Sequence, residues 1–145
     1  MFEPSEIAAQ FYRIPFQKHT QLELLDDLRV CAPDLEALQN HIGTMHGGML
    51  FALGEVATAV TMAALLAPER ASLFAITRAA EIAYLKPARG AITGSCVLAM
   101  TREEILSALE VRRSVDVPVA VELKDASDVT VATLHVVWYV ARKRP

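Results

Sequence analysis

Residues 48–67 read GMLFALGEVATAVTMAALLA, and this stretch decides the fold. Its twenty residues include one ionisable side chain, Glu55, so a helix built from them is apolar on every face. Such a helix is either a membrane span or the centre of a soluble core. The stretch is rich in alanine and glycine and lacks both a basic flank and an aromatic belt, which favours the core helix. We therefore expect the rest of the chain to wrap around it.

The segments outside this helix alternate between apolar and polar residues, as strands do. The expected strands lie at residues 73–86, 91–100, 118–124 and 129–140, and two short strands joined by an acidic turn lie within 21–32. Short helices are expected over 3–12 and 101–111, the second beginning with the capping-box spacing of Thr101 and Glu104. An antiparallel sheet curled around one central helix is the simplest α+β solution, because that helix has to be covered on all sides.

The strand expected over 73–86 carries small residues on one of its two faces. Simple alternation groups Thr77 with four neighbours, which are Ala75, Ala79, Glu81 and Ala83. Small side chains allow a helix to pack closely against a strand. We therefore expect this face, and Thr77 with it, to lie against the helix, and Tyr84 to lie on the opposite face.

Composition and charge indicate one soluble globular domain over residues 1–145. The chain has a mass of 15.8 kDa, 53% apolar and 21% charged residues, and a formal charge of -3. A chain of about 150 residues buries roughly 68–70% of its unfolded surface, which is enough for a core without disulfides or metals. The basic residues are scattered, so we expect no cationic face for nucleic acid. Residues 1–10 lack the basic region of a secretory signal, and Cys31 and Cys96 are isolated, which favours reduced thiols in a cytoplasmic protein.

The most informative motif spans residues 40–48, which read NHIGTMHGG, and Glu55 follows nine residues after His46. This pattern resembles the N-x-x-G-T-x-H-G-G…D/E signature of hotdog acyl-CoA thioesterases of the phenylacetate-degradation type, and residues 84–87 (YLKP) resemble their Y-x-x-P turn. The helix expected over 101–111 is similar to one in the branch of that superfamily labelled DUF4442. The resemblance implies a hotdog fold and hydrolysis of a hydrophobic acyl-CoA thioester without a cofactor or metal.

Gly47 and Gly48 stand where a loop is expected to enter the helix. Backbone N–H groups at that place have no partner within the helix and lie at the positive end of its dipole. They can polarise a thioester carbonyl and stabilise the negative charge that develops on its oxygen during attack. Gly47 is therefore the expected oxyanion donor, and Gly48 is expected at the substrate-binding surface.

Glu55 is unexpected in an apolar helix, because burying an unpaired carboxylate costs several kcal/mol of folding free energy. One interpretation makes it the base that activates water, or the nucleophile that forms a transient anhydride. The other makes it a structural carboxylate that caps backbone groups or pairs with Arg78 on the neighbouring strand. The pattern does not separate a base from a nucleophile.

Five more residues complete the predicted site. The resemblance gives Asn40 the role of placing water, and the alternative is an asparagine that bonds its own loop. Thr77 corresponds to a hydroxyl near the carboxylate, or else is an ordinary strand threonine. His46 is expected at the substrate site, where its ring mainly braces the loop. Lys86 and Arg89 flank the turn and are either contacts for coenzyme A phosphates or solvated charges.

A second copy of the chain is the expected partner, in a homodimer or a tetramer. The long apolar strand over 129–140 would otherwise be exposed at an open sheet edge. In the resemblance the active site lies at the dimer seam, with Asn40 and Gly47 from one chain and Glu55 and Thr77 from the other.

Other functional classes are disfavoured. His41 and His46 lack a third ligand nearby, so no metal site is expected. The chain has no nucleophile elbow or phosphate loop, and it lacks an Asp and His five residues apart at a helix entry, as hotdog hydratases use. The alternative that remains is a non-catalytic dimer that binds acyl groups or acyl-CoA.

Overall fold

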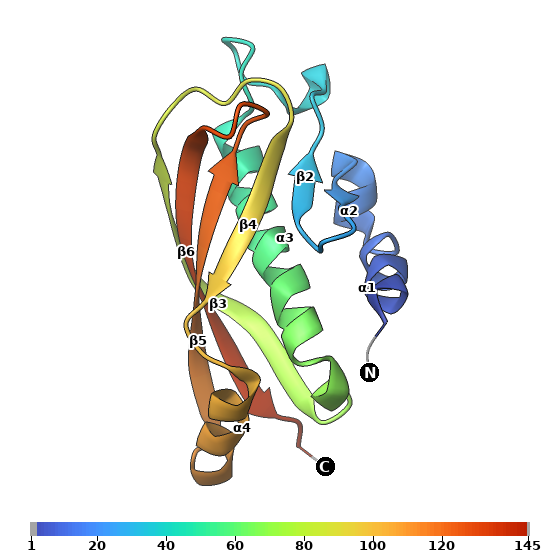
Figure 1. The fold of residues 1–145 in the computed structure, drawn as a ribbon, viewed down its shortest axis with the longest axis vertical. Coiled ribbons are helices and arrows are strands. Elements are labelled where there is room, and N and C mark those ends of the chain that lie inside the picture. Colours follow the sequence, from blue (N-terminus) through green and yellow to red (C-terminus); the bar gives the residue numbers. More distant parts are fainter. Residues whose placement is uncertain (1–2, 145) are drawn as a thin grey trace.

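A computed structural model describes residues 3–144, in which an antiparallel sheet curves around a long helix (Figure 1). The strands are β1 (Glu23–Leu24), β2 (Val30–Ala32), β3 (Leu73–Tyr84), β4 (Ile92–Leu98), β5 (Ser114–Lys124) and β6 (Thr130–Arg142). The helices are α1 (Pro4–Phe11), α2 (Pro15–Thr20), α3 (Gly47–Leu65) and α4 (Arg102–Val111), with 3-10 turns η1 (Glu36–Leu38) and η2 (Ala67–Glu69). The strand order is β1-β2-β4-β5-β6-β3, and the predicted α+β hotdog fold is confirmed.

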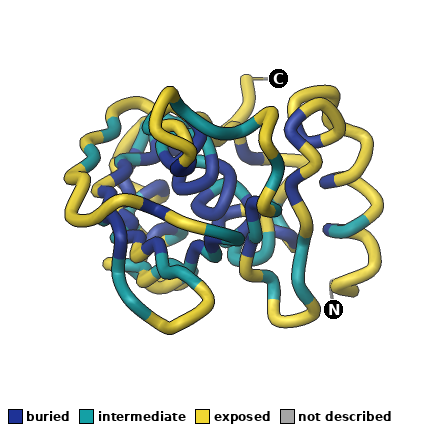
Figure 2. The backbone as a smooth tube through the Cα atoms, turned by 90° about the horizontal axis from the view of Figure 1, so that it is seen from above, coloured by how far each residue is buried: buried dark blue, intermediate teal, exposed yellow. Residues whose placement is uncertain are grey.

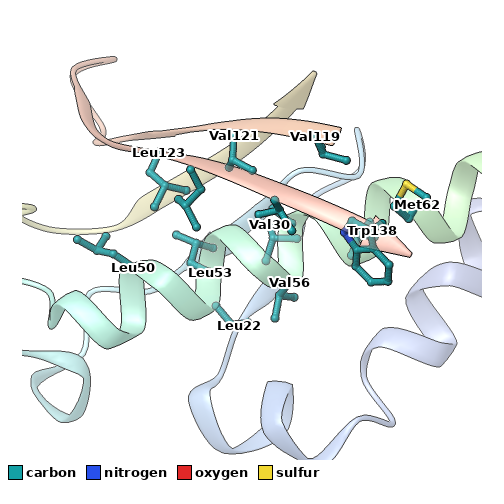
Figure 3. Packing of buried hydrophobic residues seen from close by; sticks show 14 of the residues in the cluster. Leu22, Val30, Leu50, Leu53, Val56, Met62, Val119, Val121, Leu123 and Trp138 are labelled. Carbon is teal, nitrogen blue, oxygen red and sulfur yellow. The ribbon is translucent and has the colours of Figure 1, made fainter. Parts of the chain in front are cut away.

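The long helix α3 lies in the core, as its apolar sequence predicts. Leu50, Leu53 and Val56 are buried on it, and Leu50 and Leu53 lie on the side that faces Val121 and Leu123 of β5 (Figure 3). Seen from above, the buried residues gather on α3 and on the strands around it (Figure 2). By length and composition α3 could cross a membrane, yet half of its most apolar 18-residue stretch is buried inside the protein. It is therefore a core helix rather than a membrane span.

The close approach of α3 to β6 requires a glycine. A Cβ atom at Gly54 would lie 2.5 Å from both terminal methyl carbons of Leu134, a side chain that is only 1% exposed. Glycine is the residue that leaves this space to its neighbour.

Strand β5 begins at Ser114, four residues earlier than alternation predicts, so Pro118 lies inside a strand. The carbonyl of Pro118 accepts a hydrogen bond from Ala99, just beyond the end of β4. In an antiparallel pair the N–H and C=O of one residue point to the same neighbouring strand. The N–H that Pro118 lacks would therefore have pointed toward the end of β4, where a ladder hydrogen bond is no longer required. The strand can therefore continue through the proline.

The open edge of the larger strands is β3 and not β6. Because β6 lies between β5 and β3, the prediction of an exposed edge at residues 129–140 is wrong. Alternation specifies the faces of a strand but not its neighbours. Most of β3 is exposed, including Phe74 at 47% and Ile76 at 51%. An exposed strand of twelve residues can pair with another strand.

A β-bulge reverses the faces of β3 halfway along its length. The register against β6 skips one residue between Thr77 and Ala79, which makes Arg78 the extra residue. Thr77 faces α3, as predicted. Beyond the bulge the alternation shifts by one, and Tyr84 also turns toward α3. The prediction that Tyr84 lies on the face opposite Thr77 is wrong for this reason.

The remaining elements agree with the sequence except for α2. Only one helix was expected in the N-terminal segment, over 3–12, but a second begins at Pro15, because proline fits the first position of a helix. The short β1–β2 hairpin is confirmed. The capping box of α4 is also confirmed, with reciprocal bonds between Thr101 and Glu104.

Candidate active site

The N-terminus of α3 is capped by the side chain of His46. Nδ1 of His46 accepts a hydrogen bond from the Gly48 N–H at 2.9 Å, and the His46 carbonyl accepts from Met49 and Leu50. These contacts occupy the N–H groups that follow Gly47 in the first turn. The Gly47 N–H has no hydrogen-bond partner among the described residues. It is therefore the donor that remains for a ligand.

The loop before α3 is organised by Asn40. Oδ1 of Asn40 accepts from the N–H groups of Ile42 and Thr44, both at 3.1 Å, and Nδ2 donates to Thr44 Oγ1 at 2.9 Å. Gly43 completes the turn with a φ of 75°, which suits glycine. One amide hydrogen of Asn40 is left over from these contacts. The side chain thus holds its own loop and still has a donor for a water or a ligand.

A cavity of about 630 Å³ opens at this end of α3. Its lining includes Asn40, His46, Gly47, Gly48, Tyr84 and Lys86. The hydroxyl of Tyr84 donates to the Gly47 carbonyl at 3.1 Å, and a Cβ atom at Gly47 would lie 3.2 Å from the Tyr84 ring. Glycine at this position therefore allows the ring to close over the start of the helix.

Glu55 lies on α3, half-buried, and its carboxylate is bound by Thr77. Thr77 Oγ1 donates to Glu55 Oε1 at 2.6 Å, a short bond of the kind formed to a charged acceptor. No described residue bonds to Oε2, which leaves that oxygen for a proton or an electrophile. The hydroxyl thus fixes one oxygen of the carboxylate and leaves the other open.

Arg78 does not neutralise this carboxylate. As the extra residue of the bulge, it points away from α3 and pairs with Asp116, with Nη1 at 2.9 Å from each carboxylate oxygen. The interpretation in which Glu55 pairs with Arg78 is therefore wrong.

Within one chain, the predicted site residues form two separate groups. We call Asn40, Gly47 and Tyr84 the glycine half-site, and Glu55 with Thr77 the carboxylate half-site. Glu55 follows Gly47 by eight residues, which is about 12 Å along a helix. Neither Glu55 nor Thr77 lines the cavity at the glycine half-site. A single chain therefore does not bring the two half-sites together.

Only one of the two predicted cations lines the cavity at the glycine half-site. Lys86 lines its cavity, whereas Arg89 is exposed on the turn that follows and does not contribute to the lining. Among residues 3–144 no three His, Cys, Asp or Glu side chains gather in a way that could hold a metal ion.

Sequence reasoning missed the contact between Tyr84 and Gly47. The motif drew attention to Tyr84, but strict alternation placed its ring on the wrong face. Simple alternation already places Arg78 on the face opposite Thr77, so nothing in the sequence of this strand signals the bulge.

Comparisons with known proteins give a family and a fold. The sequence profile of a family described as a domain of unknown function, DUF4442, matches residues 19–140. Among curated protein sequences, none matches the chain.

Three solved structures are similar over nearly the whole chain. A Pseudomonas aeruginosa protein of unknown function, named a probable thioesterase, has 21% identity and a TM-score of 0.83, covering 99% of both chains. A Bacillus halodurans protein solved with coenzyme A has 20% identity and a TM-score of 0.71, covering 93% of this chain and 82% of that one. The Escherichia coli PaaI protein of the phenylacetic acid degradation operon has 18% identity and a TM-score of 0.67, covering 98% and 97%. At these identities the likeness shows the fold.

Proposed function

The chain belongs to the DUF4442 family, and from this premise we propose that it is an acyl-CoA thioesterase whose active site is shared by two copies of the chain. The observation that carries the proposal is Glu55, the one carboxylate of an apolar core helix, held by Thr77 through one oxygen with the other oxygen open. Among the described residues no buried side-chain oxygen lacks a partner, so the unbonded Oε2 of Glu55 is reached by solvent and a water can approach it. The isolated cysteines Cys31 and Cys96 support a location in the cytoplasm.

The chemistry needs one donor and one base. The Gly47 N–H binds the thioester oxygen and stabilises its negative charge as water attacks the carbonyl carbon. Glu55 takes the proton from that water and returns it to the sulfur of coenzyme A as the C–S bond breaks. The products are the free acid and the coenzyme A thiol. Asn40 donates its remaining amide hydrogen to the attacking water, and Thr77 holds the carboxylate in place.

Glu55 can also act as a nucleophile by the same open oxygen, forming an anhydride with the acyl group that water then hydrolyses. The two routes differ in whether the protein carries the acyl group. Mass spectrometry of quenched single turnovers separates them, because only the anhydride adds the mass of the acyl group to the chain.

An edge-to-edge dimer through β3 would join the half-sites. The exposed β3 has the carboxylate half-site at Thr77 and the glycine half-site at Tyr84, near its end. When two copies of one strand pair in antiparallel fashion about a two-fold axis, the end of one lies opposite the beginning of the other. Glu55 of one chain then lies across the seam from Gly47 of its partner.

Coenzyme A would be held at the mouth of the same site. The Bacillus halodurans relative was solved with coenzyme A, which supports the same ligand class here. Lys86 at the rim of the glycine half-site and Arg89 on the adjacent turn are the cations for its phosphates. The thioester carbonyl then lies at the seam between Gly47 of one chain and Glu55 of the other, and the acyl group extends away from the bound coenzyme A.

The experiment that tests the function is release of free thiol from acyl-CoAs by Glu55→Gln. The substitution keeps the size of the side chain and removes the base, so kcat should fall about 100- to 10,000-fold while the fold and dimer survive. Glu110→Gln, an exposed carboxylate on α4, is the matched control and should keep the rate.

Two outcomes would overturn this proposal. Glu55→Gln with the wild-type rate would show that the carboxylate is not catalytic. Binding of acyl-CoA by the wild-type protein without any thiol release would identify the non-catalytic binding dimer instead.

A further inference from the structure

We propose that the acyl chain of the substrate lies in a second cavity of about 250 Å³ between α3 and β3, where Ala59, Ala63 and Ala75 leave room for a chain of about eight to ten carbons. The inference rests on the proposed thioesterase function and adds to it the class of acyl group. The cavity is separate from the one at the glycine half-site. Its lining includes the three alanines, Met62, Leu73 and Trp138.

The cavity begins about one helical turn beyond Glu55 along α3, and neither Glu55 nor Thr77 lines it. Residues four and eight positions after Glu55 lie on the same face of a helix, and these are Ala59 and Ala63. Both line the cavity. A thioester held at Glu55 therefore has its acyl chain next to a row of methyl groups.

The opposite wall continues from Thr77 in the same direction. Alternate residues of a strand share a face, so Ala75 and Leu73 follow Thr77 on the side of β3 that faces α3. Trp138 is the register partner of Thr77 on β6 and also lines the cavity. The lining residues of α3, β3 and β6 thus all lie on the same side of the Glu55–Thr77 hydrogen bond, toward the C-terminal end of α3.

The chemistry of the lining fits an unbranched hydrocarbon. The indole N–H of Trp138 donates to Thr58 Oγ1 at 2.9 Å, so the polar edge of the ring is satisfied and its apolar surface is free for a ligand. Met62 lies beside the ring at the same end of the core (Figure 3) and supplies a flexible apolar contact. Ala59, Ala63 and Ala75 leave the space that larger side chains would fill.

The far end of the cavity sets its length. Leu66, after α3, and Arg70 line the cavity there, and Gln10 from α1 completes the lining. From Thr77 to Leu73 the strand spans about 13 Å. An extended hydrocarbon advances about 1.3 Å per carbon, from C–C bonds of about 1.5 Å, so about ten carbons reach that end. Longer chains would meet polar side chains.

The test is the chain-length profile of kcat/KM for straight-chain acyl-CoAs from acetyl to palmitoyl, measured on the full-length protein. The wild-type profile should peak at octanoyl- or decanoyl-CoA. Ala63→Leu fills the cavity from the helix wall and should lower kcat/KM for decanoyl-CoA at least about tenfold, with butyryl-CoA changed less than about twofold. Ala75→Val narrows it from the strand wall and should act in the same direction, since valine suits a strand.

Ala64→Leu is the matched control. It adds the same volume to the next residue of α3, which lines a different cavity of about 390 Å³ with Ala57, Gly94 and Cys96. This variant should keep the wild-type profile. An unchanged profile in both Ala63→Leu and Ala75→Val would overturn the inference, as would a shift caused by Ala64→Leu alone.

The inference and the proposed function fail in different ways. Hydrolysis with a profile that ignores the cavity variants refutes the acyl site and keeps the thioesterase. If the wild-type protein releases no thiol, calorimetry with decanoyl- and acetyl-CoA still decides. Tighter binding of decanoyl-CoA that Ala63→Leu reduces about tenfold supports the acyl site, and equal binding of both ligands refutes it.

Discussion

Gly47 carries the one first-turn N–H of α3 that His46 does not occupy, and a single substitution can remove it. Gly47→Pro deletes the donor while keeping the helix, because proline fits the first helical position and His46 already has the extended backbone, with a ψ of 137°, that precedes proline. We expect kcat to fall about 100- to 1,000-fold, the loss typical of one oxyanion donor. Thiol release under saturating acyl-CoA measures it.

Gly47→Ala is the control for this experiment, because it adds a Cβ atom near the Tyr84 ring and keeps the N–H. Tyr84 is exposed and can move by the few tenths of an ångström that are needed. The alanine variant should therefore retain most of the rate. Equal losses in both variants would assign the effect to crowding against Tyr84 and not to the donor.

Gly54 is the position where core packing tolerates no side chain. Gly54→Ala should destabilise the protein by about 1–3 kcal/mol, because its methyl group would overlap the buried Leu134. In the background of Leu134→Ala the same change should be neutral or stabilising, since alanine favours a helix by about 0.5–1 kcal/mol over glycine. Urea unfolding of the wild type, the two single variants and the double variant gives the coupling free energy between the two residues. Additive free energies would show that the two residues do not compete for space.

At the scale of elements, η2 and α4 are joined by an ion pair. Nε of Arg102 donates to Glu69 Oε2 at 2.9 Å, and a second nitrogen of Arg102 contacts Oε1. The hydrogen bond from Arg102 lowers the pKa of Glu69 below its ordinary value. A carboxylate with a lowered pKa stabilises the fold above the pKa of the unfolded chain, and this stabilisation is lost as the pH falls through the folded value.

Glu69→Gln removes this pH-dependent contribution. The free energy of unfolding of the wild type should exceed that of the variant at pH 7, and the difference should shrink as the pH falls from about 5 to about 3. Glu103→Gln is the control, because Glu103 is 77% exposed and lies 3.7 Å from the same guanidinium. A constant difference between wild type and Glu69→Gln over this range would contradict the assignment.

The elements also show what local sequence can predict. The apolar run of α3, the alternation of β6 and the capping box of α4 are local patterns, and each is present in the structure. The bulge at Arg78 and the start of α2 at Pro15 depend on how neighbouring segments pack. A bulge shifts every later side chain of its strand, which is why one unpredicted residue misplaced Tyr84 but not Thr77.

For the whole molecule, the sequence predicted the residues of both half-sites, and the eight-residue step from Gly47 to Glu55 already separates the two along α3, but it could not give the strand at which a second copy would join them. That strand follows from the pairing order, which leaves β3 at the edge. Pairing order is a property of the assembled sheet, so the argument for a second copy from the apolar residues of β6 was mistaken. The argument for a second copy now rests on β3, an exposed edge strand of twelve residues that can pair with another strand.

A shared site predicts that two inactive variants restore one another. Gly47→Pro lacks the donor and Glu55→Gln lacks the base, so each homodimer should be inactive. A mixed dimer has one seam site with both groups intact, provided that donor and base come from different chains. After subunit exchange at equal concentrations, half of the dimers are mixed and each has one of two sites, so about a quarter of the wild-type rate should return. If donor and base come from the same chain, every site in the mixture keeps one defect and no activity returns. Size-exclusion chromatography with light scattering checks the premise, because the active species should have twice the 15.8 kDa mass of the chain.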